Sequence, residues 1–264
     1  MYGCDKFCTY CIVPYTRGKQ RSRKMSEILK EVQQLKDEGY KEITLLGQNV
    51  NSYGEDLNNG TDFATLLEAV AKTGIDRIRF TTSHPWDFNE DMIDIIAKYD
   101  NIMPSIHLPV QSGNDDVLQL MGRRYSKESY LKLFDMIKEK IPDCTVTTDI
   151  IVGFPNETDE QFEHTLDVVR YCKYDNAFTF IFSARPGTPA SRMHDSIDME
   201  TKRKRLAKLN KTWNDLALEK NKAYVGRTVT VLVDGLSKKN EKVYSGYPDT
   251  QKLVNFKGEN IQPG

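Results

Sequence analysis

The sequence predicts an α/β fold in which a partial (β/α) barrel is followed by a small all-β module. From about residue 42 to residue 182, short runs rich in β-branched and aromatic residues alternate with amphipathic segments. This is the pattern of a parallel sheet covered by helices. Several of the strands also have one apolar and one partly polar face, and the composition changes after residue 183.

The barrel elements follow one another as helix and strand units. The first helix fits Ser26–Glu38, with Ser26 as its N-cap and Gly39 as its left-handed stop. Strand 43–46 comes next, and a turn-rich loop covers 47–60. The later units are helix 62–72 with strand 77–82, helix 89–98 with strand 105–110, helix 127–140 with strand 145–152, and helix 158–172 with strand 177–183. Thr158 and Gln161 form a capping box at the start of the last helix.

The alternation within the strands distinguishes a barrel from a doubly wound sheet. Apolar residues alternate with His107 and Gln111 in one strand and with Thr147 and Asp149 in another, and 177–185 alternates phenylalanines with polar residues. A sheet covered on both faces should be apolar on both. A curved sheet with helices outside has an apolar outer face and a partly polar lumen. We therefore expect a partial barrel, with the apolar set of each strand facing the helices and the functional end where the strands end.

The chain after the barrel contains one long helix and then short strands. Residues 199–223 predict a helix whose apolar stripe is Leu206, Leu209, Trp213 and Leu216. Strands are expected at 227–234, 242–247 and 252–256. We divide the chain into a domain at 1–221 and a module at 222–264, which is small for an independent core.

The composition is that of a globular protein: 39% of the 264 residues are hydrophobic, 28% are charged, and the net charge is −1. No run of 18 apolar residues and no secretory h-region exists, which argues against a membrane partner. The five cysteines are an odd number, and three of them fall within the first 11 residues. This usage fits a reducing compartment, the cytoplasm, better than a secreted disulfide framework.

Three cysteines, Cys4, Cys8 and Cys11, have the spacing C-x3-C-x2-C. Thiolates at such spacing suit zinc or an iron–sulfur cluster. A structural zinc site needs four ligands, and the nearest histidine, His84, is far along the chain. We therefore predict a 4Fe–4S cluster with one iron left open. The alternative is a non-enzymatic RNA-binding module stabilised by a structural metal.

The cysteine segment resembles the cluster loop of radical S-adenosylmethionine (SAM) enzymes, in which the open iron binds the amino and carboxylate groups of SAM. Tyr10 matches the aromatic position near the adenine. Further segments look like the methylthiotransferases of this group: 12–19, 47–54, 107–113, 148–155 and 183–189. The Gln48–Asn51 stretch is similar to the MiaB-type enzymes, the tRNA 2-methylthio-N-isopentenyladenosine synthases. The sister classes act on threonylcarbamoyladenosine in tRNA or on a ribosomal protein.

The resemblance implies methylthiolation of the isopentenylated adenosine next to the anticodon. Its implied partners are a tRNA anticodon stem-loop and an electron donor such as flavodoxin or ferredoxin, with no DNA. The candidate SAM contacts are Gly47, Gln48, Ser83, Gln111, Ser112, Arg123, Asp149 and Gly153. Arg123 suits a carboxylate fork, and Glu157 belongs to the same motif as Asp149 and Gly153.

Full-length relatives carry a second cluster on an N-terminal domain and a complete RNA-binding TRAM domain, of which 222–264 resembles a part. We therefore expect this chain to bind a cluster and SAM without completing sulfur insertion.

Two basic runs are candidates for contact with RNA phosphates. The first has no acidic residue and directly follows the cysteine loop; it comprises Arg17, Lys19, Arg21, Arg23 and Lys24. The second, within 201–212, is either a solvated helix face or a further RNA contact. Tyr244, Tyr247 and Phe256 of the end module either stack on unpaired bases or form its core.

Overall fold

Five parallel strands form the centre of the molecule in the computed structural model, which describes residues 1–264. They are β1 (Glu42–Leu45), β2 (Arg77–Phe80), β3 (Ser105–His107), β4 (Thr145–Val152) and β5 (Asn176–Ile181). β1 pairs with β2 and β3–β4–β5 pair in order, while a parallel bridge between Ile78 and Ile102 joins the two groups. The strands therefore follow chain order without the reversal that a doubly wound sheet has. The predicted partial barrel is confirmed.

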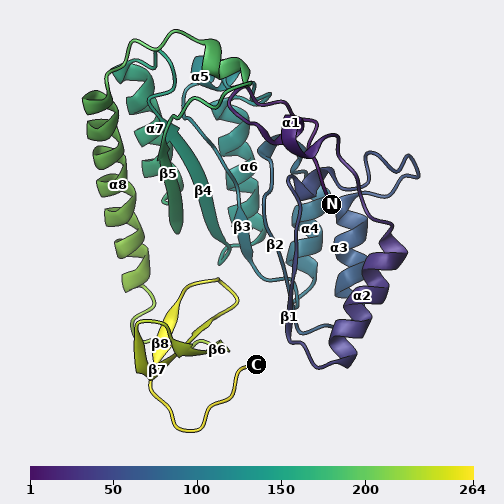
Figure 1. The fold of residues 1–264 in the computed structure, drawn as a ribbon. Helices are drawn as coiled ribbons and strands as arrows, with labels where there is room; N and C mark the ends of the chain where they lie inside the picture. Colours follow the sequence, from purple (N-terminus) through teal and green to yellow (C-terminus); the bar gives the residue numbers. More distant parts are fainter.

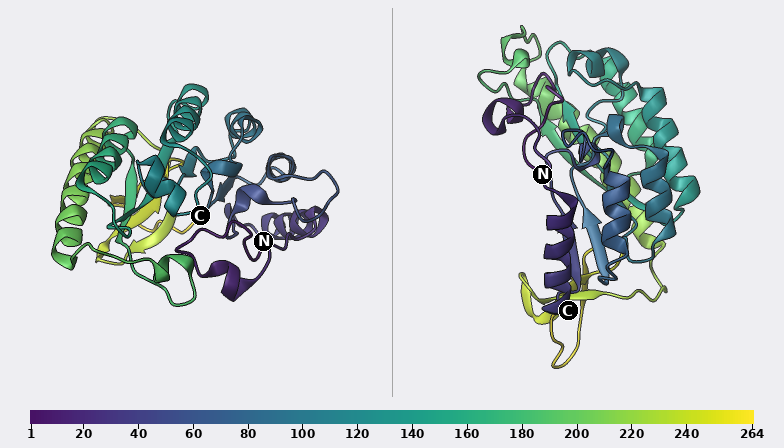
Figure 2. Two further views of the ribbon diagram at one scale, coloured as in Figure 1. Left: turned by 90° about the horizontal axis from the view of Figure 1, so that it is seen from above. Right: turned by 90° about the vertical axis from the view of Figure 1, so that its right-hand side faces the viewer.

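Helices cover the outer face of this sheet (Figures 1 and 2). They are α2 (Met25–Asp37), α3 (Phe63–Ala71), α4 (Glu90–Lys98), α6 (Lys127–Lys140), α7 (Asp159–Cys172) and α8 (Met199–Lys222). One cluster of 35 buried apolar residues lies between helices and strands. Leu209 of the predicted α8 stripe is fully buried in it, and the other three members of the stripe pack against it. The predicted helices and barrel strands agree with the structure to within a few residues.

Local capping signals were right at α7 and at the end of α2, and wrong at the start of α2. The capping box of Thr158 and Gln161 is present, and Gly39 has the left-handed φ of +89° expected of a helix stop. Ser26, however, lies inside α2, whose N-cap is Lys24 without a side-chain hydrogen bond. The helix begins one residue earlier because Met25 already packs against the core.

Several short elements were missed, and all of them lie in loops that follow strands or the cysteine segment. They are α1 (Val13–Arg17), α5 (Asp115–Leu120) and the 3-10 helices Val50–Ser52, Pro85–Asp87 and Pro189–Arg192. One or two turns are too short for a helical period to emerge from the sequence. The missed elements build the end of the barrel where the strands end.

The side chains of β5 that face the helices are the opposite set to the one expected. Phe178 and Phe180 lie on the lumen side and are 50% and 52% exposed. Thr179 faces α8 instead, where its hydroxyl donates to Oδ1 of Asn210 over 2.6 Å. A polar residue of α8 thus satisfies the threonine, so the outer face of this edge strand need not be aromatic. For β3 and β4 the expected facing is correct, since Ile106, Val146 and Ile150 are buried on the helix side.

The C-terminal module is an antiparallel sheet at the amino ends of the barrel strands (Figure 1). Its strands are β6 (Leu232–Ser237), β7 (Asn240–Tyr247) and β8 (Val254–Phe256). β6 starts five residues later than predicted. The carbonyl of Thr230, which precedes β6, accepts from Arg77 Nη2 of the barrel over 3.4 Å. Arg79 donates to the carbonyls of Pro248 and Asp249 over 2.8 and 3.0 Å, which holds the module against the barrel. None of the helices is long and apolar enough to cross a membrane.

Candidate functional site

The segment that carries the three clustered cysteines lies across the carboxyl ends of the strands (Figure 1). Thr9 fixes it on two sides. Its backbone N–H donates to the carbonyl of Met121 over 2.9 Å, its hydroxyl donates to the carbonyl of Leu120 over 2.7 Å, and its carbonyl accepts from Ala190 N–H over 2.9 Å. The loop is therefore bound to the end of α5 and to the turn at 189–192.

A close backbone approach closes the cysteine loop at its base. Tyr2 and Arg21 form an antiparallel bridge, and Gly3 has a φ of +73°. A Cβ atom at Gly3 would lie only 2.1 Å from the carbonyl oxygen of Lys19. Only glycine combines this φ with this contact, so Gly3 determines the shape of the loop.

The three thiols are free, with Cys8 buried and Cys4 and Cys11 partly buried. Burial raises the pKa of the Cys4 and Cys11 thiols, and the charges of the neighbouring thiols add to the rise. In a 4Fe–4S cluster each thiolate binds a different iron, and three free thiols on one loop match the three-thiolate set that the spacing predicts.

Cys144 and Cys172 do not belong to this site. Burial raises the pKa of each thiol to about 12, which leaves both protonated and unreactive at neutral pH. They are packing residues of the main core.

Arg123 is a cation next to the thiols. It donates from Nη2 to the hydroxyl of Tyr10 over 2.8 Å, and its guanidinium carbon lies 5.8 and 5.9 Å from the ring centres of Tyr10 and Tyr125. Its Nε is buried and has no acceptor. Burial alone would lower the pKa of Arg123, but the two tyrosines and Cys8 outweigh burial and raise it. A buried cation with an unused donor near Cys8 and Cys11 fits an anionic group at this position.

The first predicted SAM contacts, Gly47 and Gln48, lie in the loop after β1. A Cβ at Gly47 would lie 2.6 Å from Cγ of Met1, whose ammonium group donates to the carbonyl of Leu46 over 3.1 Å. Met1 thus covers Gly47 in this structure. After β2, the Ser83 hydroxyl is buried and has no hydrogen-bond partner in the protein.

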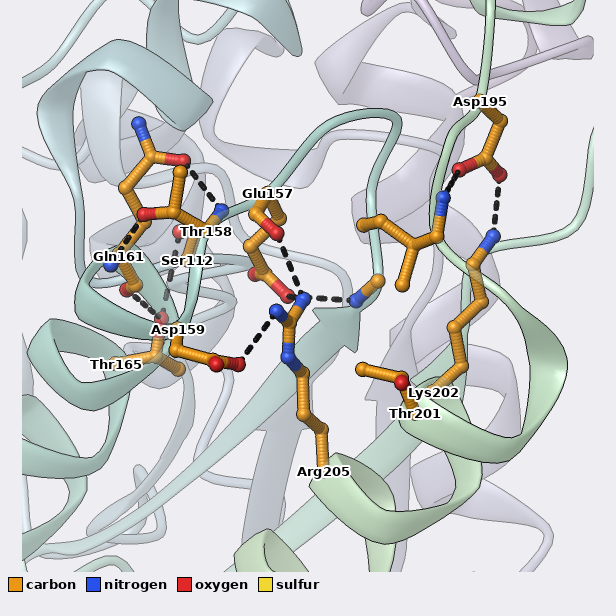
Figure 3. Close-up of polar contacts among 12 residues, drawn as sticks. Ser112, Glu157, Thr158, Asp159, Gln161, Thr165, Asp195, Thr201, Lys202 and Arg205 are labelled. Carbon is orange, nitrogen blue, oxygen red and sulfur yellow. Dashed lines mark hydrogen bonds and ion pairs between the residues drawn. The ribbon is translucent and has the colours of Figure 1, made fainter.

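Gln111, four residues beyond the end of β3, lies beside Asp149 in the second half of β4. Gln111 has a left-handed φ of +65°, its N–H donates to the carbonyl of Asp149 over 2.8 Å, and its carbonyl accepts from Ile151 N–H over 3.0 Å. Ser112, in contrast, turns towards α7. Its hydroxyl is 3.4 Å from that of Thr165 and accepts from Asn114 N–H over 3.3 Å. The Ser112 hydroxyl is thus used in contacts within the fold (Figure 3).

Gly153 ends β4 in a turn with a φ of +67°. Its N–H donates to Oε2 of Glu157 over 2.8 Å, and Arg205 of α8 donates from Nη1 to the same oxygen over 3.0 Å (Figure 3). Arg205 also donates from Nη2 to Asp159 over 2.8 Å. Burial raises the pKa of Glu157, and the Gly153 N–H and Arg205 oppose that rise. Sequence reasoning missed Arg205 because its partner is far away in the chain.

The first basic run is exposed, and only Arg23 has an ion-pair partner, Glu31. The loop after β1 fixes its position: the Ser52 hydroxyl donates to Gln20 Oε1 over 2.6 Å, and Asp56 accepts from Ser22 N–H over 2.8 Å. The second run has two buried cations, and its other cations are exposed. Lys202 and Arg205 are buried in ion pairs, and Lys204, Lys208 and Lys211 have acidic partners. This arrangement favours the interpretation of 201–212 as a structural helix face.

A cavity of about 1180 Å³ lies between the inner face of the sheet and the C-terminal module. His107 lines it, with Nδ1 2.9 Å from the Thr147 hydroxyl and Nε2 3.4 Å from Asp149. Phe178 lines it as well, with its ring centre 6.0 Å from that of His107. The phenylalanine alternation in 177–185 was the sequence signal for Phe178.

The parallel strands, the cysteine loop at their ends and the lumen below it define the class of protein. The model of the Radical SAM superfamily matches residues 1–169, and the chain belongs to this superfamily. A 4Fe–4S cluster and SAM are the cofactors that membership implies. The three thiols and the buried Arg123 fit such a cluster.

Two curated relatives are similar to this chain over nearly its whole length. The chain is 57% identical over 260 residues to the tRNA-2-methylthio-N(6)-dimethylallyladenosine synthase of Staphylococcus epidermidis, covering 98% of this chain and 50% of that protein. It is 56% identical over 261 residues to the enzyme of that name from Staphylococcus aureus, covering 97% and 50%. The chain thus spans about half the length of the curated relatives it matches.

Solved structures support the fold. The radical SAM methyltransferase TsrM from Kitasatospora setae superposes with a TM-score of 0.59 at 17% identity, over 72% of this chain and 37% of that one. Coproporphyrinogen III oxidase from Escherichia coli, a radical SAM enzyme, gives a TM-score of 0.58 at 15% identity, over 94% and 65%. At these identities the likeness concerns the fold alone.

Proposed function

We propose that this chain is the radical SAM part of a tRNA methylthiotransferase that acts on N6-dimethylallyladenosine, the isopentenylated adenosine next to the anticodon. The observation that carries this proposal is the 57% identity over 98% of the chain to a synthase named for that nucleoside. Residues 1–221 would form the radical SAM domain, and 222–264 would form an RNA-binding module of the TRAM type.

Cys4, Cys8 and Cys11 would hold one 4Fe–4S cluster in this chain. When bound, the reduced cluster supplies the single electron that cleaves a C–S bond of SAM. Tyr10 and Arg123 would line this site, because their hydrogen bond places a cation beside the thiols. The cation would offset the negative charge of the ligated cluster.

Gly47, Gln48, Ser83, Gln111, Asp149 and Gly153 would contact SAM. The unpartnered Ser83 hydroxyl and the backbone hydrogen bonds that join Gln111 to β4 support this assignment. Arg123 retains its buried Nε for a carboxylate, since Nη2 is used by Tyr10. Ser112 would act indirectly, by fixing the turn that follows Gln111.

The tRNA anticodon stem-loop would dock on Arg17, Lys19, Arg21, Arg23 and Lys24. Their exposure next to the cysteine loop supports the assignment, because phosphate contacts position the nucleic acid for the chemistry. A flavodoxin or ferredoxin would deliver the electron. Five free thiols are consistent with a cytoplasmic enzyme.

The test is anaerobic reconstitution of the chain with iron and sulfide, followed by incubation with dithionite, SAM and tRNA that carries N6-dimethylallyladenosine. We expect 5′-deoxyadenosine to form. Chromatography for the methylthiolated nucleoside, with tRNA carrying threonylcarbamoyladenosine in parallel, separates the proposed substrate from that of a sister class. A chain that binds zinc, takes up no iron and leaves SAM intact would instead be a metal-stabilised RNA-binding module.

A further inference from the structure

The lumen face of β5 carries an apolar strip that the fold does not require. Phe178 stands in register with Asp149, and Phe180 with Ile151, so their side chains lie on the same side of the sheet as those lumen residues. Both rings are about half exposed. The residues that attach β5 to the helices are the alternate ones, such as Ala177, which is buried. Phe178 lines the cavity beside the C-terminal module, and Phe180 continues the strip two residues further along the same face of β5. Exposed apolar side chains on a concave face indicate a ligand surface.

Polar groups stand opposite the strip. His107 meets Phe178 edge to face, with an angle of 72° between the rings. Thr147 and Asp149 contact the two ring nitrogens of His107, which fixes the orientation of the imidazole. The cavity of about 1180 Å³ exceeds the size of typical small-molecule sites, so a whole nucleoside fits within it. An aromatic wall beside hydrogen-bonding groups is the usual environment of an unstacked base.

We propose that the lumen face of β5 is the subsite for the target base, where Phe178 and Phe180 contact the apolar N6 substituent of a dimethylallylated adenine. This inference rests on the proposed function and goes further by naming the residues that select the alkylated base. The phosphates of the RNA lie outside, on the basic run at 17–24, whose four unpaired cations complement them. The base leaves its stack to enter the lumen. Burial of the five-carbon group against two rings then distinguishes it from unmodified adenine.

The experiment compares two synthetic anticodon stem-loops that differ only in N6-dimethylallyladenosine or adenosine at the target position. Fluorescence anisotropy at one salt concentration gives the ratio of the two dissociation constants. We expect the parent chain to prefer the alkylated RNA, and Phe178→Ala and Phe180→Ala each to reduce that preference about tenfold. Phe178→Leu keeps an apolar contact and should keep most of the preference. Tyr40→Ala, an exposed ring outside the lumen, is the matched control and should change nothing.

The possible outcomes distinguish the β5 subsite from the proposed function. A parent chain that prefers the alkylated RNA, together with alanine variants that keep the preference, overturns the β5 subsite but not the proposed function. A parent chain that binds both RNAs equally overturns both. An alanine variant that lowers the affinity for both RNAs equally also contradicts the subsite. Removal of a ring that touches only the alkyl group must change the ratio of the two dissociation constants.

Discussion

Arg205 on α8 donates a hydrogen bond over 3.0 Å to the carboxylate of Glu157, which lies 48 residues earlier in the chain (Figure 3). Both side chains are nearly inaccessible to solvent, at 8% and 1% exposed. The same carboxylate oxygen accepts the N–H of Gly153, the glycine that ends β4. The outermost helix is thus joined, through one buried ion pair, to a turn of the candidate cofactor site.

Arg205→Met should destabilise the fold strongly. The change leaves the Glu157 carboxylate buried without its cation, which typically costs about 3–5 kcal/mol. Urea denaturation measures the loss in the free energy of unfolding. Lys208→Met is the matched control on the same helix, because its ion pair with Glu163 is exposed and contributes at most about 1 kcal/mol. In the double variant Glu157→Gln with Arg205→Met, much of the stability should return, since no buried charge remains. Equal losses in Arg205→Met and Lys208→Met would contradict the buried pair.

Gly3→Ala should prevent the cysteine loop from forming its site. The new Cβ would lie 2.1 Å from the Lys19 carbonyl, and the φ of +73° adds strain. Iron content after anaerobic reconstitution should therefore fall severalfold. Gly18→Ala has the same φ but nothing within 4 Å of its Cβ, so it isolates the effect of strain from that of the contact. If both variants retained full iron content, the backbone approach at Gly3 would not matter for the site.

Cys8→Ala should abolish cluster assembly, as should Cys4→Ala and Cys11→Ala, because each thiolate binds a different iron. Cys144→Ala is the control: it removes a buried thiol from the core and should leave the iron and sulfide content per folded chain unchanged. Iron and acid-labile sulfide analysis measures both. Loss of iron in Cys144→Ala with retention in Cys8→Ala would reverse the assignment.

The sequence was sufficient for features whose causes are local. The thiol spacing, the capping box of Thr158 and the helical periods each act over a few residues, and the structure contains all of them. Alternation in β5 identified two sets of side chains but could not tell which set faces outward. That choice depends on Asn210 of α8, which satisfies Thr179. Similarly, Arg205 and Lys202 belong to a charge run, and only the folded chain reveals the acidic partners that bury them.

Asp175→Asn should weaken the attachment of the C-terminal module in a pH-dependent way. Burial alone would raise the pKa of Asp175, but Lys220 and Lys252 outweigh it and hold the pKa below its usual 3.8. A lowered folded-state pKa means that the carboxylate stabilises the fold above about pH 4, and that this stability is lost as the pH falls through the folded-state value. Denaturation should therefore show a loss of about 2–3 kcal/mol at pH 7, which shrinks at pH 3. Asp215→Asn, in an exposed pair with Lys211, is the control. A loss in Asp175→Asn that did not change with pH would rule out the charge as its cause.

Neutralising the basic run at 17–24 should weaken RNA binding through its salt dependence. Each phosphate contact releases counterions, so the slope of log K against log salt changes by about 0.7–0.9 for each phosphate that the protein no longer neutralises. Lys19→Gln and Arg21→Gln are suitable changes because both side chains are exposed and have no ion-pair partner. The matched controls are Arg203→Gln and Lys204→Gln, exposed cations of α8 that we assign to a structural helix face.

The measurement is fluorescence anisotropy with an anticodon stem-loop over a series of salt concentrations. The loop after β1 holds residues 20–23 in place through Gln20 and Ser22, so the cations beside them are already positioned before RNA binds. The Lys19 and Arg21 variants should therefore lower the slope in proportion to the charge removed, without altering thermal stability. A slope that decreased equally in the α8 variants would place the RNA on both runs and contradict the structural assignment of residues 201–212.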